Sequence, residues 1–266
     1  MSEILHDPDV MGERRERILS ALQDAGFVTI DGLAQRFGCS AQTVRRDLIA
    51  MEQQGLLKRF HGGAGLAETV ARPSYSAKQE INPAGKGAIG RAAAEVVRDG
   101  ETVLFDVGTT VEAAATALRA RLDDGRLSDV RGICVALNAA MILAGAPGIT
   151  VEVLPGEVNT PDGAITGAAA VSALRDIRLD HAFLGVSAFD AEGAAWDFDS
   201  AKVAVKRAAI DAAKDAWALA DAGKFSRTAG RRVCGARQLR GIITDRAPQA
   251  DLAEAFELAE CAVVVG

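Results

Sequence analysis

Hydrophobic residues recur at helical spacing in the first part of the chain. Ile18, Leu19 and Leu22 share one face of a predicted first helix, and Val44 and Leu48 share one face of a later helix. Small polar residues and glycines stand where such helices begin and end. The pattern predicts three short helices and a strand, over residues 14–24, 30–37, 40–54 and 56–60. Three helices followed by a strand and a tight turn predict a winged helix-turn-helix domain.

From residue 86 onward, strand-length apolar runs alternate with helical segments. The runs show little polar alternation, which is typical of parallel strands that are buried on both faces. They cover residues 102–105, 133–137, 151–154, 182–186, 216–220, 241–244 and 262–265. The helical segments cover residues 84–98, 111–121, 168–177, 200–213 and 248–258. This half therefore predicts an α/β fold with a mostly parallel, Rossmann-like sheet between two layers of helices.

These two patterns divide the chain of 266 residues into two domains. We predict a winged helix-turn-helix domain over residues 12–66, a poorly periodic linker over 67–85 and an α/β domain over 86–266. No apolar run approaches the roughly 18 residues that a membrane-spanning helix needs. The first residues are polar and acidic, unlike a secretory signal. The cytoplasm is therefore the expected location, with no membrane partner.

The formal net charge of −6 argues by itself against binding to nucleic acid. The segment 36–59 departs from this average, because its cations outnumber its carboxylates. It holds Arg36, Arg45, Arg46, Lys58 and Arg59 against Asp47 and Glu52. The four cysteines are widely spaced and form neither a metal-ligand pattern nor a disulfide framework. We expect buried thiols and neither a metal nor a cofactor.

The stretch that begins at Ser40 has the residue types of a DNA-recognition helix. Such a helix needs a small polar N-cap and hydrogen-bonding or cationic side chains on the outer face of its early turns. We expect Gln42 and Arg45 to read base edges. Phosphate or adjacent-groove contacts are expected from the helix and the wing, through Ser40, Thr43, Arg46, Lys58, Arg59 and His61. A carboxylate repels phosphate, so we expect Asp47 to orient a neighbouring arginine instead.

Ligands bind to parallel sheets at the carboxyl ends of the strands. The segment 106–110 follows the first apolar run and leads into a helix, so its backbone N–H groups and two threonine hydroxyls suit an anion. Polar residues follow other runs as well, at Asn138, Glu157, Ser187, Asp190, Glu192, Asp221 and Lys224. Polar groups at several strand ends fit a phosphorylated polyol as the ligand.

The chain resembles the DeoR family of bacterial transcriptional repressors from about residue 12 to its end. The resembling segments are SAQTVRRDL (40–48), KRFHGGA (58–64), DVGTT (106–110), HAFLG (181–185) and LADAGKF (219–225). In that family the second domain is similar to ribose-phosphate isomerase and binds a sugar phosphate as inducer. The resemblance implies a homo-oligomer, either dimer or tetramer, that binds double-stranded operator DNA through paired half-sites.

The resemblance also implies roles for residues of the second domain. The implied phosphate contacts are Gly108, Thr109 and Thr110 with Lys86 or Lys224. Asp106 and Asp190 are implied to accept sugar hydroxyls, and Asn138 to add a polar contact. Lys202 and Ala204 stand where the family commonly has acidic residues, so the identity of the effector stays open.

Two other functions are compatible with parts of the sequence. The second domain would act as a sugar-phosphate isomerase if Asp190 or Glu192 served as general base. However, the clustered acids of such an enzyme are only partly present, and an enzyme has no use for a DNA-binding domain. An activator or architectural protein needs the winged helix alone. We therefore expect a non-enzymatic repressor of a carbohydrate or polyol catabolic operon, released from its operator by a phosphorylated sugar or polyol.

Overall fold

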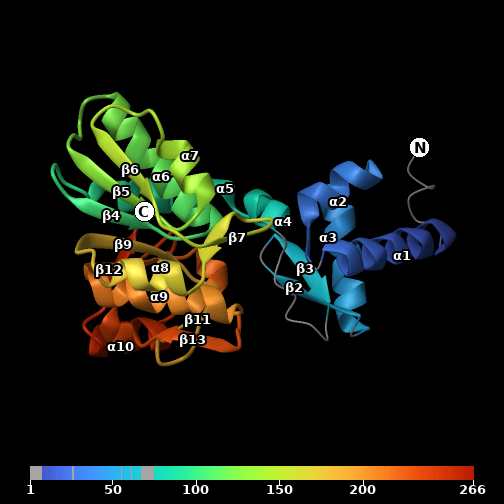
Figure 1. Ribbon diagram of the computed structural model, residues 1–266. Helices are drawn as coiled ribbons and strands as arrows, with labels where there is room; N and C mark the ends of the chain where they lie inside the picture. Colours follow the sequence, from blue (N-terminus) through green and yellow to red (C-terminus); the bar gives the residue numbers. More distant parts are fainter. Residues whose placement is uncertain (1–7, 26, 55, 61, 67–74) are drawn as a thin grey trace. The chain divides into compact units, whose positions relative to one another are not determined.

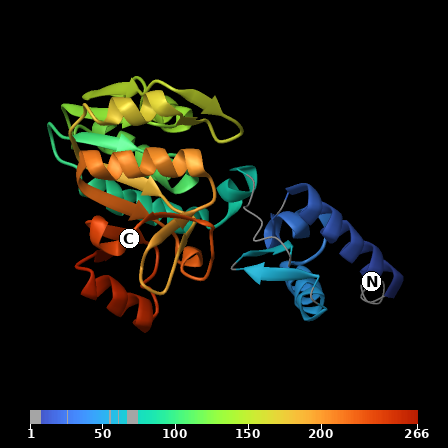
Figure 2. The same cartoon turned by 60° about the horizontal axis from the view of Figure 1, so that its bottom comes forward.

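The computed structural model describes residues 8–25, 27–54, 56–60, 62–66 and 75–266 (Figures 1 and 2). The chain forms two compact units, Met1–Asn82 and Pro83–Gly266. We predict the segment 67–85 as a linker. Helix α4 (Tyr75–Glu80) lies within it, and helix α5 (Pro83–Glu95) begins in it. The boundary between the compact units therefore coincides with the start of α5.

The first unit is a winged helix-turn-helix, as predicted. It contains α1 (Pro8–Ala25), β1 (Phe27–Thr29), α2 (Ile30–Phe37), α3 (Ala41–Gln53), β2 (Leu57–Phe60), β3 (Gly63–Leu66) and α4. β3 pairs antiparallel with β1 on one side and with β2 on the other. The apolar stripes of the helices form the core, in which Ile18, Leu22, Val44, Leu48 and Met51 are fully buried. β1, which the sequence predicts only as an apolar lead-in, is the third strand of the wing sheet.

Local hydrogen bonds explain where α2 and α3 begin. The Thr29 hydroxyl accepts a hydrogen bond from the Gly32 N–H at 3.0 Å, and the Ser40 hydroxyl accepts one from the Thr43 N–H at 3.1 Å. Gly38 ends α2 with a φ of 62°. Glycine adopts this left-handed conformation at little cost, so α3 can follow α2 after a very short turn.

The second unit is built on a seven-stranded sheet in the order β15-β14-β12-β9-β4-β5-β6. All neighbouring strands of this sheet are parallel. Its strands are β4 (Thr102–Phe105), β5 (Val130–Cys134), β6 (Ile149–Val153), β9 (Leu179–Gly185), β12 (Ala213–Leu219), β14 (Gly241–Thr244) and β15 (Ala262–Val265). Each apolar run identified in the sequence overlaps one of these strands, so the predicted parallel α/β fold is confirmed.

Helices cover both faces of this sheet (Figures 1 and 2). One buried cluster includes residues of α5, α6 (Thr109–Asp123) and α7 (Leu137–Leu143). The other includes residues of α8 (Ala168–Leu174), α9 (Ser200–Ala212) and α10 (Ala250–Leu258). Successive side chains of a strand point to opposite faces. Leu104 accordingly packs in the second cluster, whereas Val103 and Phe105 pack in the first.

Two short antiparallel elements stand apart from the main sheet. β7 (Glu157–Asn159) and β8 (Ala164–Thr166) form a hairpin after β6, and β10 (Ala188–Phe189), β11 (Ala195–Asp197) and β13 (Arg231–Cys234) form a small sheet. None of these strands is predicted from the sequence, because two to four residues carry too little periodicity. Both elements follow carboxyl ends of main-sheet strands and add side chains to that edge.

The chain changes direction across the sheet between β4 and β9. From β4 it proceeds outward to β5 and β6, whereas from β9 it proceeds the other way to β12, β14 and β15. A crevice forms at such a reversal, outside the carboxyl ends of the two strands. The segment Asp106–Thr110 follows β4 and Gly185 ends β9, so both lie at the carboxyl edge of the sheet where the direction reverses.

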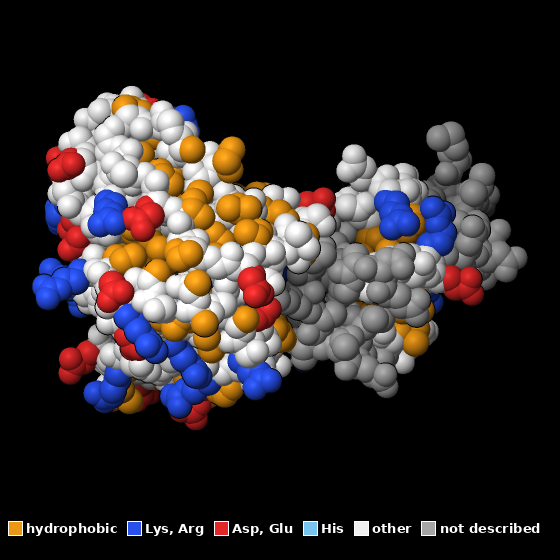
Figure 3. Space-filling view, in the orientation of Figure 1, with side chains coloured by type: hydrophobic (Ala, Val, Ile, Leu, Met, Phe, Trp, Pro, Cys, Tyr) orange, Lys and Arg blue, Asp and Glu red, His pale blue; other side chains and the backbone are white. Residues whose placement is uncertain are grey.

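Exposed apolar side chains lie on α7, β6 and β7 of the second unit. Met141, Val153 and Val158 are 74%, 43% and 52% exposed. Figure 3 shows apolar side chains gathered over the middle of this unit, where these elements lie in Figure 1. Within the described ranges, no helix combines the length and the apolar composition that crossing a membrane requires.

Candidate functional site

The outer face of α3 presents the side chains that we predict to read DNA. Val44 and Leu48 are fully buried, which leaves Gln42, Arg45 and Arg46 exposed. At the start of the helix, the Ser40 and Thr43 hydroxyl oxygens lie 2.9 Å apart. Hydroxyls and unpaired N–H groups at a helix N-terminus favour an anion such as a DNA phosphate.

Asp47 holds α3 against α1. Its side chain is 3% exposed, and Arg14 Nε donates a hydrogen bond to Asp47 Oδ2 at 2.5 Å. Arg15 Nε lies 3.8 Å from the other carboxylate oxygen. The hydrogen bond with Asp47 raises the pKa of Arg14, against the opposing effect of burial. The carboxylate therefore orients an arginine, as its chemistry predicts, and that arginine belongs to α1.

The wing is also connected to α3. The Arg59 backbone N–H donates to Glu52 Oε1 at 2.8 Å, and Arg59 Nε donates to Glu52 Oε2 at 2.7 Å. The side-chain bond and then the backbone bond lower the pKa of Glu52. Lys58 precedes Arg59 on β2 and is exposed. His61, also predicted to contact DNA, lies outside the described residues.

A buried lysine of α9, Lys206, contacts residues at or just after the ends of β4, β9 and β11, at the carboxyl edge of the main sheet. Lys206 Nζ contacts Asp106 Oδ2, lies 3.5 Å from Asp197 Oδ2 and donates to the Gly185 carbonyl oxygen at 2.7 Å. The Gly185 N–H donates in turn to Asp106 Oδ2 at 3.0 Å. Burial alone would lower the pKa of Lys206, but the two carboxylates outweigh burial and raise it. Lys206 is therefore a charged group that fixes both carboxylates in place.

Close backbone contacts shape the segment that follows β4. A Cβ on Gly185 would lie 2.6 Å from the Val107 carbonyl oxygen, so only glycine fits there. Gly108 has a φ of 144°, which strains any other residue. Thr109 and Thr110 then begin α6, and no side chain of the described residues caps this start. The first N–H groups of α6 are therefore oriented to bind an anion.

Tight packing of α5 on α6 positions the first cation of the site. A Cβ on Gly90 would lie 2.5 Å from the Ala113 carbonyl oxygen of α6. Lys86 is one turn earlier on the same face of α5, and it interacts electrostatically with Glu112 in the first turn of α6. Burial lowers the pKa of Lys86 to about 8, and Asp221 and Glu112 offset this only in part.

Two further cations belong to the turn after β12. Asp221 opens this turn and accepts a hydrogen bond from the Gly223 N–H at 3.0 Å. Burial lowers the pKa of Lys224 to about 8, against the attraction of Asp221. Arg227 and Lys86 lower the pKa of Lys224 further, so the three cations lie within electrostatic reach of one another. Such a group of desolvated cations suits a dianion such as a phosphate ester.

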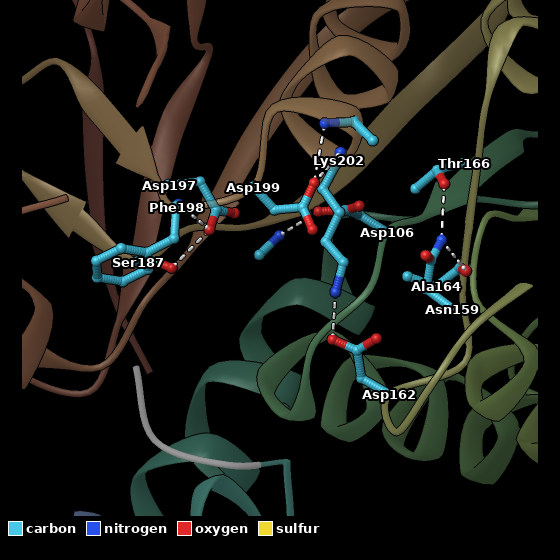
Figure 4. A network of polar contacts seen from close by, with 12 residues as sticks. Asp106, Asn159, Asp162, Ala164, Thr166, Ser187, Asp197, Phe198, Asp199 and Lys202 are labelled. Carbon is cyan, nitrogen blue, oxygen red and sulfur yellow. Dashed lines mark hydrogen bonds and ion pairs between the residues drawn. The ribbon is translucent and has the colours of Figure 1, made fainter. Parts of the chain in front are cut away.

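Asn138 connects these cations to the β7–β8 hairpin. Its Nδ2 lies 3.2 Å from Glu112 Oε1 and 3.4 Å from the Asp162 carbonyl oxygen. The Asp162 carboxylate forms an ion pair with Lys202 of α9, which is 5% exposed. Figure 4 shows this pair near Asp106. The hairpin is therefore attached directly to α7 and α9, and through Asn138 to α6, at the carboxyl edge of the sheet.

The structure brings most of the predicted effector residues into one connected group, namely Lys86, Asp106, Gly108, Thr109, Thr110, Asn138 and Lys224. Asp190 is placed differently, because its carboxylate accepts hydrogen bonds from the Ala194 N–H and Trp196 Nε1, both at 2.7 Å, within the β10–β11 turn. Arg227, which the sequence pattern does not single out, interacts electrostatically with Lys224 of this group. The sequence does offer one sign of this, because Arg227 stands three residues after Lys224 in the same turn.

Potential metal ligands and cysteines are further candidates for chemistry in this chain. Among the described residues, no cluster of three or more His, Cys, Asp or Glu side chains is arranged to hold a metal ion. All four cysteines are free thiols, and Cys134, Cys234 and Cys261 are buried, as the sequence predicts.

A winged helix with an exposed cationic recognition face, joined to a separate parallel α/β unit, is the organisation of a transcriptional regulator with a sensor domain. Comparison with known proteins shows that this chain belongs to the DeoR family. The DeoR-like helix-turn-helix domain matches residues 14–70, and the DeoR C terminal sensor domain matches residues 81–246.

Two of the similar proteins that match over most of their length are repressors. The HTH-type transcriptional repressor CsqR of Escherichia coli (strain K12) is 31% identical over 95% of this chain and 94% of its own. The glycerol-3-phosphate regulon repressor of the same strain is 31% identical over 89% and 91%. A D-ribose-5-phosphate isomerase in complex with phospho-erythronic acid matches at 16% identity and a TM-score of 0.40, over 53% of this chain and 52% of that one. That likeness is too low to assign an activity.

Proposed function

We propose that the chain represses a carbohydrate or polyol catabolic operon and leaves its operator when a phosphorylated sugar or polyol binds. The observation that carries this proposal is the group of Lys86, Lys224 and Arg227 beside the uncapped start of α6. A group of one buried and two half-buried cations next to a helix N-terminus suits a phosphate. One of the similar repressors is named for a glycerol-3-phosphate regulon, which agrees in ligand class.

The proposed DNA contacts follow from the exposed side chains of the first unit. Gln42 and Arg45 read base edges in the major groove, where an arginine pairs with guanine through two hydrogen bonds. The contacts that fix the helix on the phosphate backbone are Ser40, Thr43, Arg46 and Lys58. Arg59 acts mainly on the wing, because Glu52 already holds its guanidinium and its backbone N–H.

The proposed effector contacts lie at the carboxyl edge of the sheet. The phosphate is held by Lys86, Lys224, Arg227 and the first N–H groups of α6, with the hydroxyls of Thr109 and Thr110. Asn138 donates to the sugar or polyol chain. Asp106 acts indirectly on the effector. Its carboxylate accepts hydrogen bonds from the Gly185 N–H and from Lys206, and it thereby positions Lys206.

Release from DNA requires that the effector favour one of two arrangements of an oligomer. We propose a homo-oligomer, because a single recognition helix covers only one half-site and a repressor reads two. The exposed apolar side chains of α7, β6 and β7 are compatible with this proposal. Light scattering on the purified protein distinguishes dimer from tetramer, and a monomer at cellular concentrations would contradict it.

We further propose that the sensor site binds its ligand without converting it. An isomerase needs a carboxylate that is free to abstract a proton from the substrate. Asp106 and Asp197 are held by Lys206, Asp190 is held by the β10–β11 turn, and Glu192, the other candidate base, is an exposed residue of that turn. Incubation of the protein with aldose phosphates should therefore leave the aldose-to-ketose ratio unchanged.

A thermal-shift screen tests the sensor site. A ligand at 100 times its Kd stabilises the folded state by roughly 2.7 kcal/mol. We expect at least one phosphorylated sugar or polyol to raise the Tm of the wild-type protein and to leave that of Lys224→Met unchanged. A compound that stabilises both proteins equally would show that it binds elsewhere.

A further inference from the structure

Strand β6 forms one outer edge of the seven-stranded sheet (Figure 1). β5 pairs with one side of β6, and among the described residues no strand pairs with its other side. Such an edge readily pairs with a strand of another chain, and proteins protect it with lysines, prolines or a β-bulge. Ile149–Val153 contains neither lysine nor proline, and its register with β5 is regular. Its one charged residue, Glu152, is paired with Arg131 of β5, so the edge lacks the usual protection.

The hydrogen bonds to β5 show which backbone groups of β6 point outward. Gly148 and Leu154, which flank β6, each form a backbone hydrogen bond with β5. The backbone groups of successive residues in a strand point to opposite sides, so every second residue from Gly148 to Leu154 faces β5. The N–H and C=O groups of Ile149, Val151 and Val153 therefore face away from β5.

These outward groups are complementary to a second, antiparallel copy of the same strand. When Val151 lies opposite Val151 of the second copy, Ile149 lies opposite Val153, and all of the outward N–H and C=O groups form hydrogen bonds. Thr150 then lies opposite Glu152, so no like charges oppose each other. Pairing centred on Glu152 would instead place two carboxylates opposite each other, which is destabilising.

Helix α7 lies beside this edge on one face of the sheet. It connects β5 to β6 and packs on both strands, so its axis runs above the gap between them. Adjacent strands are about 4.8 Å apart, so a two-fold axis at Val151 places the axes of the two α7 helices about 10 Å apart. Packed helices have interaxial distances of about 8–10 Å. The strand pairing therefore brings the two helices to packing distance.

The side of α7 that would face the second copy is apolar and exposed. Buried residues of α7 face the sheet, and Asn138 contacts Glu112 of α6, on the inner side of α7. At about 100° per residue, Leu137 and Met141 lie on the side away from α6. Their side chains are 38% and 74% exposed. Contact with a second α7 would remove this apolar surface from water.

The opposite edge of the sheet, at β15, is less suited to the same contact. α10 connects β14 to β15 as α7 connects β5 to β6, so a two-fold axis at β15 would bring two α10 helices together. α10 exposes three carboxylates, those of Asp251, Glu254 and Glu257, and like charges repel. α7 contains no ionisable side chain. Charge therefore favours the β6 edge.

We propose that two copies of this chain associate through β6, which pairs antiparallel with β6 of the second copy around a two-fold axis at Val151, and through the apolar side of α7. A two-fold contact is closed, so it forms a dimer and not a filament. This proposal rests on the proposed function, because it assigns the surface through which the proposed homo-oligomer forms. Asn138, a proposed effector contact, belongs to the same helix, so the effector would touch an element of the contact.

Proline substitutions on the two sheet edges test the strand pairing in the full-length protein. Val151→Pro removes an outward N–H from β6 but no hydrogen bond to β5. Its matched control is Val263→Pro on β15, where Ala262 donates to Arg240 and Val263 therefore faces outward. Val151→Pro deletes two hydrogen bonds at the two-fold axis and should weaken the association at least about tenfold. Val263→Pro should associate like the wild type, as measured by sedimentation.

Lysine substitutions on two exposed apolar helix positions test the contact between helices. Met141→Lys places two ammonium groups in the apolar contact and should also weaken the association at least about tenfold. Leu258→Lys on α10, where Leu258 is 68% exposed, is the matched control and should have no effect. Circular dichroism establishes that each variant is folded. Because Met141 is a surface residue, Met141→Lys decides the proposal even if Val151→Pro does not fold.

Cysteine variants test the register. Co-expressed Thr150→Cys and Glu152→Cys chains should form a disulfide-linked dimer on oxidation, because residues directly opposite each other have Cα atoms about 4.5–5.5 Å apart. Neither variant alone should form the link, since diagonal positions are about 7–8 Å apart. Wild-type protein oxidised in the same way is the control for its own cysteines. A link in either variant alone, without one in the mixed population, would overturn the pairing centred on Val151.

Sedimentation separates failure of this contact from failure of the proposed function. A wild-type protein that remains a monomer overturns both this proposal and the proposed homo-oligomer. A wild-type oligomer that neither Val151→Pro nor Met141→Lys weakens overturns the β6 contact alone. Dissociation by Val263→Pro and Leu258→Lys instead would assign the contact to the β15 edge and would likewise refute the proposal.

Discussion

Replacement of Asp47 by alanine tests how the recognition helix is held. The change leaves the Arg14 guanidinium, which is 8% exposed, without its carboxylate partner. Loss of one partner from a buried ion pair costs about 3–5 kcal/mol. A unit of the length of Met1–Asn82 is stable by about 4–12 kcal/mol. The substitution therefore removes a large part of the stability of the first unit and leaves the second unit unaffected.

The two tryptophans make the assay selective, because Trp196 and Trp217 both belong to the second unit. Tryptophan fluorescence reports unfolding of that unit, whereas far-ultraviolet circular dichroism reports both. For Asp47→Ala we expect the transition of the first unit to move down by at least about 12 °C. The tryptophan transition should not move. Operator affinity should fall in proportion to the folded fraction of the first unit.

Two control variants separate charge from fold. Glu16→Ala removes an exposed carboxylate from α1 and should change stability by less than about 0.5 kcal/mol. Arg14→Met combined with Asp47→Leu replaces the ion pair by apolar side chains and should recover most of the stability. If Asp47→Ala unfolds like the wild type and binds operator DNA equally well, the proposed attachment of α3 to α1 is wrong.

Other predictions concern DNA binding, the effector and pH. Arg45→Ala should weaken specific DNA binding by about 1–3 kcal/mol without unfolding the protein, and unchanged affinity in an anisotropy titration would contradict its base-reading role. Thr109→Ala should bind DNA normally but respond less to effector, whereas Asp106→Ala should destabilise the second unit by about 3–5 kcal/mol, as melting curves will show. The pKa of Lys86 and of Lys224 is about 8, so both lose positive charge as pH rises from 7 to 9 while the phosphate ester stays dianionic. Effector affinity should therefore fall across this range, and a constant Kd would refute the cationic site.

The main-sheet strands are predictable because a parallel strand buried on both faces is a continuous apolar run. Helix α7 is missed for a related reason. Leu137 extends the apolar run of β5, so the pattern predicts a strand through 133–137, whereas β5 ends at Cys134 and α7 begins at Leu137. A short apolar segment does not by itself distinguish a buried strand from a buried helix.

The candidate site is predictable where local sequence creates it and unpredictable where distant residues meet. The segment 106–110 is recognisable, because a glycine and two threonines between a strand and a helix are typical of an anion site. The pairing of Lys206 with Asp106 joins residues separated by 100 positions. In the sequence, Lys202 departs from the family pattern and has no evident partner. In the structure, the β7–β8 hairpin places the Asp162 carboxylate against its ammonium group. Only the fold supplies these partners.

We expect a phosphorylated compound that binds to the second unit to release DNA that is bound by the first. Duplexes selected by the full-length protein from a random library provide a labelled operator for anisotropy titrations. A polyol phosphate that stabilises the protein, added at 100 times its Kd, should lower operator affinity at least about tenfold, a coupling of about 1.4 kcal/mol. Lys224→Met should bind the same operator and keep its affinity when the compound is added. An operator complex that is unaffected by a compound bound to the wild-type protein would contradict the account.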